Sequence, residues 1–387
     1  MARRIGVLTG GGDVPGLNVV IKTLTARMED GGWEVLGLKR GWASLLHAGP
    51  GSPFPGTDWV VRLTRQNTRT IDRTGGTMLH SSRTNPASVR PVEIPVHLKG
   101  VASEPGENGR VDLTREAIRT VETLGLDMLI AIGGDDTLSF ARRLDAEGLK
   151  VIGIPKTMDN DVFGTDYCIG FSTAVSRSVN MITDLRSPAG SHERFLVIEL
   201  FGRNSGETSL MISLLSMADR ALISEVPFDK ERVIELISRD KRDNPSNYAV
   251  LTISEGSTEI GGEVVESGEP DAYGHRKLGG IGEQLSEYIK SRTQEGTVYQ
   301  RLAYLMRSGP ADSLDKLVAI SYARIAADLA ITGTAGKLVG VDKGIYATKP
   351  ISIVGEGVRK VNVDKYYDVA AYRPKLHSVL GHPMFLE

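Results

Sequence analysis

GIPKTMDNDVFGTD, residues 153–166, joins the end of a short apolar run to a cluster of charged and amide side chains. The apolar run, 151–154, predicts a buried strand, and a second predicted strand, 128–132, ends in the acidic stretch GGDDT at 133–137. Open α/β sheets bind their ligands outside the carboxyl ends of the strands. We therefore expect two strand ends to present carboxylates and a lysine to one cleft, which suits metal-assisted phosphoryl transfer.

Strand and helix patterns alternate on both sides of this stretch, and glycines such as Gly125 and Gly148 close the predicted helices. Further strands are predicted at 4–8, 33–38, 58–64, 194–200, 220–223 and 248–253, and helices at 17–28, 114–124, 138–144, 172–185, 281–292 and 313–331. This alternation predicts an α/β fold with mostly parallel sheets and right-handed crossovers. The tail from Val341 shows little periodicity, and we expect it to wrap the surface.

Composition narrows the function classes. The 387 residues allow two or three compact lobes, and 46 basic against 48 acidic residues give a net charge of −2. This balance disfavours nucleic acid or an anionic membrane as the main partner, and we find no apolar run long enough to span a bilayer. The N-terminus enters a strand pattern at once, which disfavours a signal peptide. Cys168 is the only cysteine, so we expect no disulfide, no thiolate metal cluster and a cytoplasmic enzyme.

The first predicted strand leads into a glycine loop, Thr9 to Gly16, and then into a helix. Backbone N–H groups and the helix dipole can bind an anion at such a junction, although a tight turn without a ligand fits the pattern equally well. The loop is not a Walker A motif and lacks the spacing of a dinucleotide site. A charged group nevertheless recurs at four strand ends, 10–13, 133–137, 155–161 and 201–206, with glycines at three of them, which turns alone do not require.

The acidic residues at these strand ends suit phosphoryl transfer, which needs a metal ion, cations on the phosphoryl group and a base for the attacking hydroxyl. Asp135 suits Mg²⁺, which prefers one or two carboxylates together with phosphate oxygens and water. Asp159 and Asp161 are the candidates for the general base. Taken alone, Asp-Asn-Asp is more often a turn whose side chains cap the backbone, and Lys156 is equally compatible with an exposed loop charge.

Taken together and in this order, these residues resemble the phosphofructokinase family. The matching blocks are LTGGGD at 8–13, PGLN at 15–18, GGDDT at 133–137, PKTMDND at 155–161, GTDY at 164–167, IGF at 169–171, SHER at 191–194 and FGR at 201–203. The resemblance implies two Rossmann-like three-layer lobes with the active site in the cleft between them. Residues 1–169 plus 307–355 would form the phosphoryl-donor and magnesium lobe, and 170–306 plus 356–387 the fructose 6-phosphate lobe.

The resemblance also implies a role for each matching residue. Asp159 would take the proton from the 1-hydroxyl of fructose 6-phosphate, with Thr157 and Asp161 beside it. Asp135 would hold Mg²⁺. The remaining residues implied on the donor side are Gly11 and Arg83.

On the acceptor side, the residues implied to bind the sugar phosphate are Phe201, Gly202, Arg203, Glu225, Tyr304 and Arg307, with Arg203 also counted as catalytic. Arg194 would reach the 6-phosphate of a neighbouring subunit, so the resemblance implies a homodimer or homotetramer with shared sites. The second cross-subunit arginine of the family is not at its expected place, and Arg301 is the nearest candidate. Phe201 stands where methionine is usual.

Asp136 and Lys156 form the pair that marks the pyrophosphate-dependent members. A carboxylate at Asp136 opposes the charge where a nucleotide α-phosphate would lie. At about 5 Å and an effective dielectric constant near 20 the repulsion is roughly 3 kcal/mol, or about two orders of magnitude in affinity. We therefore predict reversible phosphorylation of fructose 6-phosphate by pyrophosphate in glycolysis or gluconeogenesis.

Other functions stay open on the sequence. The nearest are an ATP-dependent 6-phosphofructokinase and a pyrophosphate enzyme that prefers sedoheptulose 7-phosphate. An NAD or lipid kinase shares a turn similar to GGDDT at 133–137. It is disfavoured because PKTMDND and FGR lie outside that shared pattern. A non-catalytic regulatory subunit is disfavoured because Asp135, Asp159 and Arg203 are all present.

Overall fold

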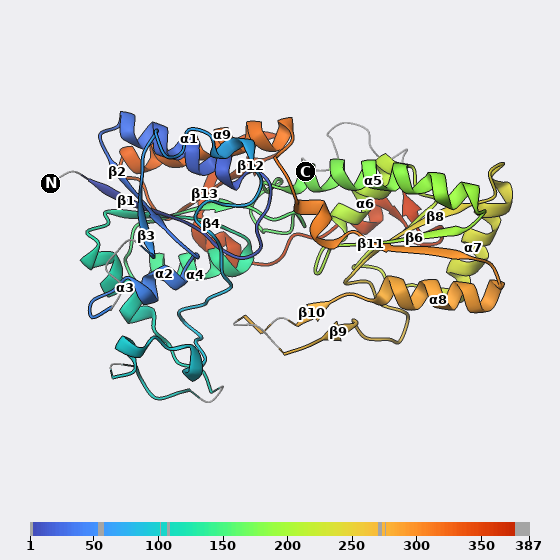
Figure 1. Cartoon of the computed structure of the whole chain (residues 1–387), viewed down its shortest axis with the longest axis horizontal. Helices are drawn as coiled ribbons and strands as arrows, with labels where there is room; N and C mark the ends of the chain where they lie inside the picture. The colour runs from blue at the N-terminus through green and yellow to red at the C-terminus, as the bar shows by residue number, and fades with distance from the viewer. Residues whose placement is uncertain are drawn as a thin grey trace.

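The computed structural model describes residues 3–52, 58–100, 102–106, 109–269, 273–274 and 276–375. Two lobes lie side by side along the long axis of the molecule, each built around its own sheet (Figure 1). The chain crosses between them more than once, because residues 313–350 return to the first lobe and residues 363–374 pack on the second. Within the described residues, every helix is too short or too polar to cross a membrane.

The sheet of the first lobe has the order β13-β12-β5-β4-β1-β2-β3 among the described residues. Its strands are β1 Arg4–Thr9, β2 Glu34–Leu38, β3 Val60–Leu63, β4 Met128–Gly133, β5 Val151–Pro155, β12 Lys337–Asp342 and β13 Ile345–Pro350. The five inner strands pair in parallel, and only the edge strands β3 and β13 are antiparallel. β4 is buried along its whole length because helices cover both faces, as its continuous apolar sequence requires.

Helices cover this sheet on both sides (Figure 1). α1 Leu17–Asp30 and α9 Ser313–Ile331 pack together on one face. The helices on the other face are α2 Ala43–His47, α3 Thr114–Thr123 and α4 Asp135–Ala146. Because α4 begins at Asp135, directly after β4, the acidic turn lies at the carboxyl edge of the sheet.

The sheet of the second lobe has the order β11-β6-β8-β7, and all of its pairs are parallel. Its strands are β6 Phe195–Leu200, β7 Arg220–Leu222, β8 Ala249–Ser254 and β11 Thr297–Arg301. α5 Phe171–Ser191 and α6 Glu207–Ser216 cover one face, and α7 Lys230–Asp243 and α8 Ile281–Thr293 the other. The small elements are β9 Glu266–Ser267, β10 Lys277–Leu278, α10 Val363–Tyr366, β14 Tyr367–Asp368, β15 Arg373–Pro374 and 3₁₀ turns at 71–73, 91–93, 96–98, 303–307 and 351–355.

The predicted α/β fold with two lobes and mostly parallel sheets is confirmed. The first sheet uses residues from 4–155 and 337–350, and the second uses 195–301. The exact lobe boundaries stay a prediction, and residues 376–387, assigned to the second lobe, lie outside the described residues.

One local expectation fails, and one helix was not predicted. The tail from Val341 does not only wrap the surface, since β13 is the edge strand of the first sheet. Lys343 and Gly344 form the turn before it, both with positive φ (51° and 79°), as two-residue hairpin turns require. The strand has no buried face and therefore lacks an apolar period. The helix α7 was not predicted, although Asp229 caps it by accepting the N–H groups of Glu231 and Arg232.

Candidate active site

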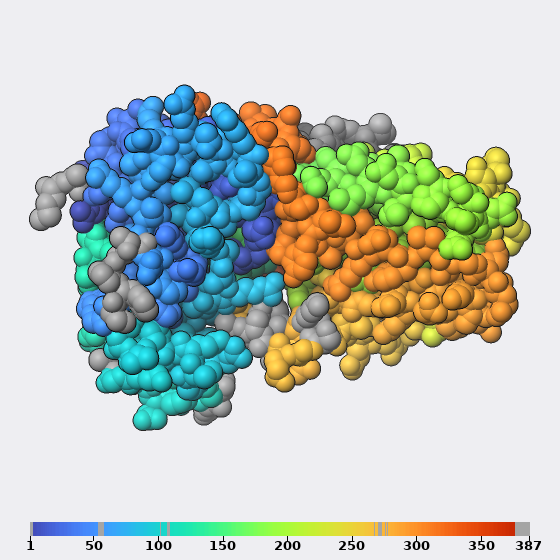
Figure 2. All heavy atoms as spheres, in the orientation of Figure 1, coloured from blue at the N-terminus to red at the C-terminus, as the bar shows by residue number. Residues whose placement is uncertain are grey.

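Two adjoining cavities, of about 370 and 790 Å³, lie between the lobes. Both are lined by Gly11, Gly12, Arg83, Phe201, Arg203, Glu255, Tyr304 and Arg307, so they form one continuous space. The surface is hollowed where the two lobes meet (Figure 2). The cleft lies at the carboxyl ends of β1, β4 and β5 from one lobe and of β6 and β8 from the other.

Most of the predicted site residues come together in this cleft. They are Gly11, Arg83, Asp135, Asp136, Lys156, Thr157, Asp159, Asp161, Phe201, Arg203, Tyr304 and Arg307. Asp135 and Lys156 meet there because β4 and β5 are parallel neighbours, with Gly133 opposite Pro155. The last four of the set come from the second lobe and from the 3₁₀ turn after β11, which closes the cleft from the far side.

Three predicted residues do not line the cleft. Arg194 is exposed before the amino end of β6, while the cleft lies beyond the other end. A six-residue strand spans about 20 Å, so Arg194 is too far to reach the cleft of its own chain. Gly202 has φ 142°, and its carbonyl accepts from the Ser224 hydroxyl and the Gly256 N–H. Glu225 accepts the backbone N–H groups of Gly206 and Val361, at 3.0 and 2.9 Å, and so ties two loops together.

Glu255 was not predicted as a site residue, yet it lines both cavities. It follows β8, which is the neighbour of β6, whereas Glu225 follows the short edge strand β7. The sequence did carry a signal for Glu255, because this carboxylate directly follows an apolar strand. The sequence alone does not give the order of the strands, which is what places that strand end at the cleft.

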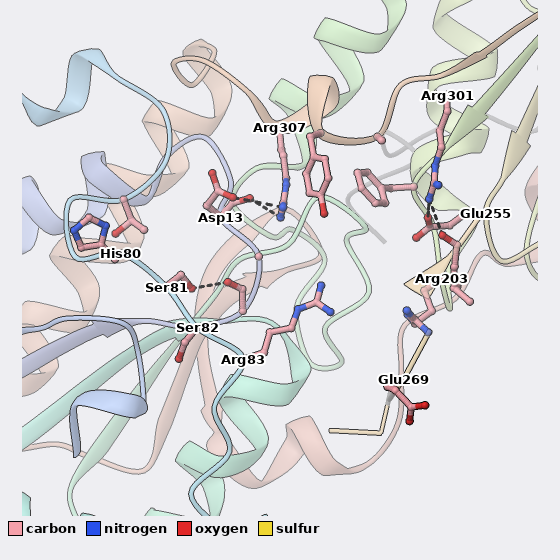
Figure 3. A pocket seen from close by; sticks show the side chains of 17 residues that line it. Asp13, His80, Ser81, Ser82, Arg83, Arg203, Glu255, Glu269, Arg301 and Arg307 are labelled. Atoms are coloured by element: carbon pink, nitrogen blue, oxygen red, sulfur yellow. Dashed lines mark hydrogen bonds and ion pairs between the residues drawn. The ribbon is translucent and has the colours of Figure 1, made fainter. Parts of the chain in front are cut away.

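Arg301 lies at the end of β11 and pairs with two carboxylates of its own chain. Its guanidinium lies 3.1 Å from Glu199 and 3.2 Å from Glu255. Figure 3 shows the Arg301–Glu255 pair on one side of the cleft and the Arg307–Asp13 pair on the other, with Arg203 below the first pair and Arg83 below the second. The structure thus places four arginines of one chain around the larger cavity.

The carboxylates of the cleft are buried close to one another. Burial, with the charges of Asp161 and Asp136, raises the pKa of Asp135 to about 8. Burial raises the pKa of Asp161 to about 6. The pKa of Asp159 is raised well above its usual value by burial and by Asp161 and Glu255, although Arg203 and Lys156 oppose this shift. A cation in the cleft would relieve the repulsion among these groups.

One carboxylate oxygen of Asp135 and one of Asp159 are buried without a hydrogen-bond partner among the described residues. Buried polar atoms are nearly always paired, so these two oxygens are positioned for ligands. No group of three or more histidine, cysteine or acidic side chains in the described part of the chain could enclose a metal ion alone. Asp135 nevertheless fits Mg²⁺, which takes one or two carboxylates and completes its shell with phosphate oxygens and water.

Lys156 is 4% exposed, which rules out the alternative of an exposed loop charge. Its Nζ donates to the carbonyl oxygen of Gly12. Burial, and then the charge of Arg307, lowers the pKa of this amine to about 8. Arg307 in turn donates to the carbonyl oxygen of Asp13 at 3.2 Å. Lysine and arginines therefore face the carboxylates across the cleft, an arrangement that fits a metal-bound phosphate.

Comparisons with known proteins identify the family of the chain. The family described as Phosphofructokinase matches residues 4–330. The chain is 37% identical to the pyrophosphate–fructose 6-phosphate 1-phosphotransferase of Amycolatopsis methanolica, over 87% of this chain and 90% of that protein. It is also 34% identical to the ATP-dependent 6-phosphofructokinase of Chloroflexus aurantiacus, over 90% of each chain.

A solved structure supports the fold. The pyrophosphate-dependent phosphofructokinase of Marinobacter aquaeolei superimposes with a TM-score of 0.75, at 17% identity, over 97% of this chain and 89% of that one. The family inferred from the blocks at 8–18, 133–137 and 155–203 is thereby confirmed, and the chain belongs to the phosphofructokinase family.

Proposed function

We propose that this chain transfers a phosphoryl group from pyrophosphate to the 1-hydroxyl of fructose 6-phosphate, reversibly, giving fructose 1,6-bisphosphate and phosphate in glycolysis or gluconeogenesis. The observation that carries the proposal is the position of Asp136 in the cavity wall, beside Asp135 and the buried Lys156. Relatives that cover most of the chain and are named for this reaction support it.

On the donor side, Asp135 would hold Mg²⁺, which when bound neutralises negative charge on the phosphate oxygens. The fixed cations that face the donor are Lys156 and Arg83. Gly11 has φ 76°, and a side chain at this position would approach the Lys156 amine to 3.3 Å. The glycine therefore leaves the space in which a phosphate can approach both the backbone and the lysine.

On the acceptor side, Asp159 removes the proton from the attacking 1-hydroxyl. The unpaired carboxylate oxygen of Asp159 is the acceptor for that proton. Thr157 holds the loop, because its hydroxyl accepts the Asp159 N–H at 3.1 Å. Arg203 faces the same cavity and, with Asp161, Phe201 and Glu255, forms the wall against which the sugar phosphate lies.

Donor choice follows from charge at Asp136. A nucleotide α-phosphate beside this carboxylate meets a repulsion of roughly 3 kcal/mol at an effective dielectric constant near 20. Pyrophosphate has no third phosphate and avoids this cost.

The relative named as ATP-dependent keeps an ATP enzyme as the second candidate. The deciding experiment assays the purified chain with pyrophosphate and with ATP side by side, each with fructose 6-phosphate and with sedoheptulose 7-phosphate. We expect turnover with pyrophosphate and fructose 6-phosphate. Turnover with ATP alone would refute the donor assignment. No turnover with either donor would favour a regulatory subunit.

The assembly is part of the same proposal. Arg194 lies about 20 Å from the cleft of its own chain, the length of β6, so it can bind a 6-phosphate only in a neighbouring subunit. We expect a homodimer or homotetramer with shared active sites, located in the cytoplasm. Tyr304 and Arg307, which line both cavities, would hold the 6-phosphate from within the chain.

A further inference from the structure

A segment beyond the residues matched by the family runs back along the catalytic loop. The family match ends at residue 330, and Val358 forms an antiparallel bridge with Val162. One residue on, the Arg359 N–H donates to the carbonyl oxygen of Asp161 at 2.9 Å. The backbone of this segment is therefore fixed to the loop that carries Asp159 and Asp161.

The side chain of Arg359 makes a second set of contacts with the same loop. Its Nη1 donates to the carbonyl oxygen of Asn160 at 3.3 Å and to the carboxylate of Glu207. Both partners of this ion pair are largely buried, with side-chain exposures of 15% and 7%. Glu207 lies in the first turn of α6, and its other oxygen accepts from the Asn160 amide at 3.0 Å.

Asn160 is the residue on which these contacts converge. It is fully buried and has φ 54°, so it turns the chain between Asp159 and Asp161. Its side-chain oxygen accepts the Cys168 N–H at 2.7 Å, and its amide also donates to the Asp166 carbonyl at 3.0 Å. A residue held at its side-chain amide, its side-chain oxygen and its carbonyl oxygen in a left-handed conformation fixes the directions of its two neighbours.

We propose that Arg359 and Glu207 are positioning residues, a buried ion pair that holds Asn160 and thereby aims the carboxylates of Asp159 and Asp161 into the cleft. This inference rests on the proposed function. Burying two charges is costly unless both are paired and hydrogen-bonded, and here each charge also bonds the catalytic loop. Neither residue lines the cavity in which the substrates meet, so they act only through that loop.

Replacing Arg359 should therefore reduce turnover more than binding. In Arg359→Ala we expect kcat to fall about 10- to 100-fold, because a small misplacement of a reacting group has an effect of this order. The KM values for pyrophosphate and fructose 6-phosphate should change by less than about threefold. The matched control is Arg220→Ala, which removes another buried ion pair of the second lobe, with Asp240, away from the cleft. We expect this control to lose thermal stability and keep its kcat.

Chemical rescue separates positioning from general stability. Arg359 and Glu207 line a further cavity of about 370 Å³, which shares only Val358 with the cleft. Guanidinium added at non-denaturing concentration can enter the space left in Arg359→Ala and should restore part of the lost kcat. In Arg359→Met the side chain fills that space without charge, so no rescue is expected. Glu207→Gln keeps the shape and the Asn160 bond, and should show a smaller kcat loss with unchanged KM.

Each outcome decides the matter. Folded Arg359→Ala with wild-type kcat would overturn the inference, as would equal kcat losses in Arg359→Ala and Arg220→Ala without rescue. If Arg359→Ala does not fold, wild-type kcat in Glu207→Gln would overturn it. An inactive wild-type chain would refute the proposed function and this inference with it, whereas an active wild type with unaffected variants would refute this inference alone.

Discussion

Lys156 and Gly12 are joined across the donor cavity, where the lysine Nζ donates to the glycine carbonyl oxygen at 2.5 Å. The bond ties the loop after β5 to the glycine loop after β1. The ammonium group is therefore held in place before any substrate arrives, although the lysine has a flexible side chain and is almost fully buried. A fixed cation facing a cavity needs no reorganisation when a phosphate binds.

The same burial makes donor binding sensitive to pH. Because the pKa of Lys156 is lowered to about 8, its charge is lost as the pH rises through that value. We expect kcat/KM for pyrophosphate to fall about tenfold for each unit above pH 8, since kcat/KM reports the free enzyme. Lys156→Arg keeps its charge over this range. Its profile should lack the fall, even if its absolute activity is lower. An identical alkaline limb in both proteins would exclude Lys156 as the responsible group.

A measurement of folding stability shows whether the loss of activity at high pH comes from unfolding, because deprotonation of Lys156 has the opposite effect on stability. The pKa of Lys156 is lowered on folding from 10.5 to about 8, so the unfolded chain binds more protons between these values. This lysine therefore costs folding free energy below about pH 8, and the cost is relieved as the pH rises toward 10.5. Thermal denaturation across the alkaline range should show no loss of stability due to Lys156 while donor use declines.

Asp136→Gly should gain use of ATP. Removing the carboxylate relieves the repulsion of a nucleotide α-phosphate, and we expect kcat/KM for ATP to rise about 100-fold. Asp136→Asn is the matched variant, because it removes the charge but keeps the volume. A gain in both variants would assign the discrimination to charge, and a gain only with glycine would assign it to space. No gain in either would refute the donor argument.

The sequence predicts the position of a charged side chain well where that side chain follows the end of a strand and the neighbouring strand of the chain is also its neighbour in the sheet. Asp135 and Lys156 follow strands that are neighbours in the chain and in the sheet, so parallel pairing brings them together. Glu255 shows the limit of that reasoning. Choosing it over Glu225 requires the order β11-β6-β8-β7, which depends on packing between distant segments.

Contacts made by residues late in the chain could also not be predicted from the sequence. β13 carries no buried face, so its pattern does not show that it joins the first sheet. Arg359 follows an irregular segment, and only the fold brings it to Asn160, 199 residues earlier. The pairing of Arg301 with Glu199 and Glu255 is likewise tertiary, since these residues come from three different strand ends.

Removal of Mg²⁺ should abolish turnover, and we expect Asp135 to be the residue responsible for binding the metal ion. Asp135 binds a metal in its ionised form, and burial together with the charges of Asp161 and Asp136 opposes that ionisation by raising its pKa to about 8. Added Mg²⁺ with pyrophosphate should therefore raise the melting temperature of the wild type, by binding only the folded protein. Asp135→Asn should show little shift at the same concentrations. An equal shift in both proteins would place the metal elsewhere.

Sharing of sites between subunits can be tested with two inactive variants. Asp159→Asn lacks the base and should lose about 10²- to 10⁴-fold in kcat, whereas Arg194→Ala lacks the arginine that its neighbour needs. In a mixed dimer, one site combines the intact Asp159 of one chain with the intact Arg194 of the other. Random assembly then makes half of the dimers mixed, each with one complete site, so co-refolded variants should recover about one quarter of wild-type activity.

The geometry of β6 makes this recovery a decisive result. Because Arg194 and the cleft lie at opposite ends of that strand, a site made within one chain cannot use both residues. Activity in the mixture that exceeds the sum of the separate variants therefore requires an arginine from the neighbouring subunit. The control is a mixture of Asp159→Asn with Lys156→Ala, two defects that fall in the same chain's cleft. Every site in that mixture carries one defect, so it should stay inactive, and its recovery would show that mixing itself restores function.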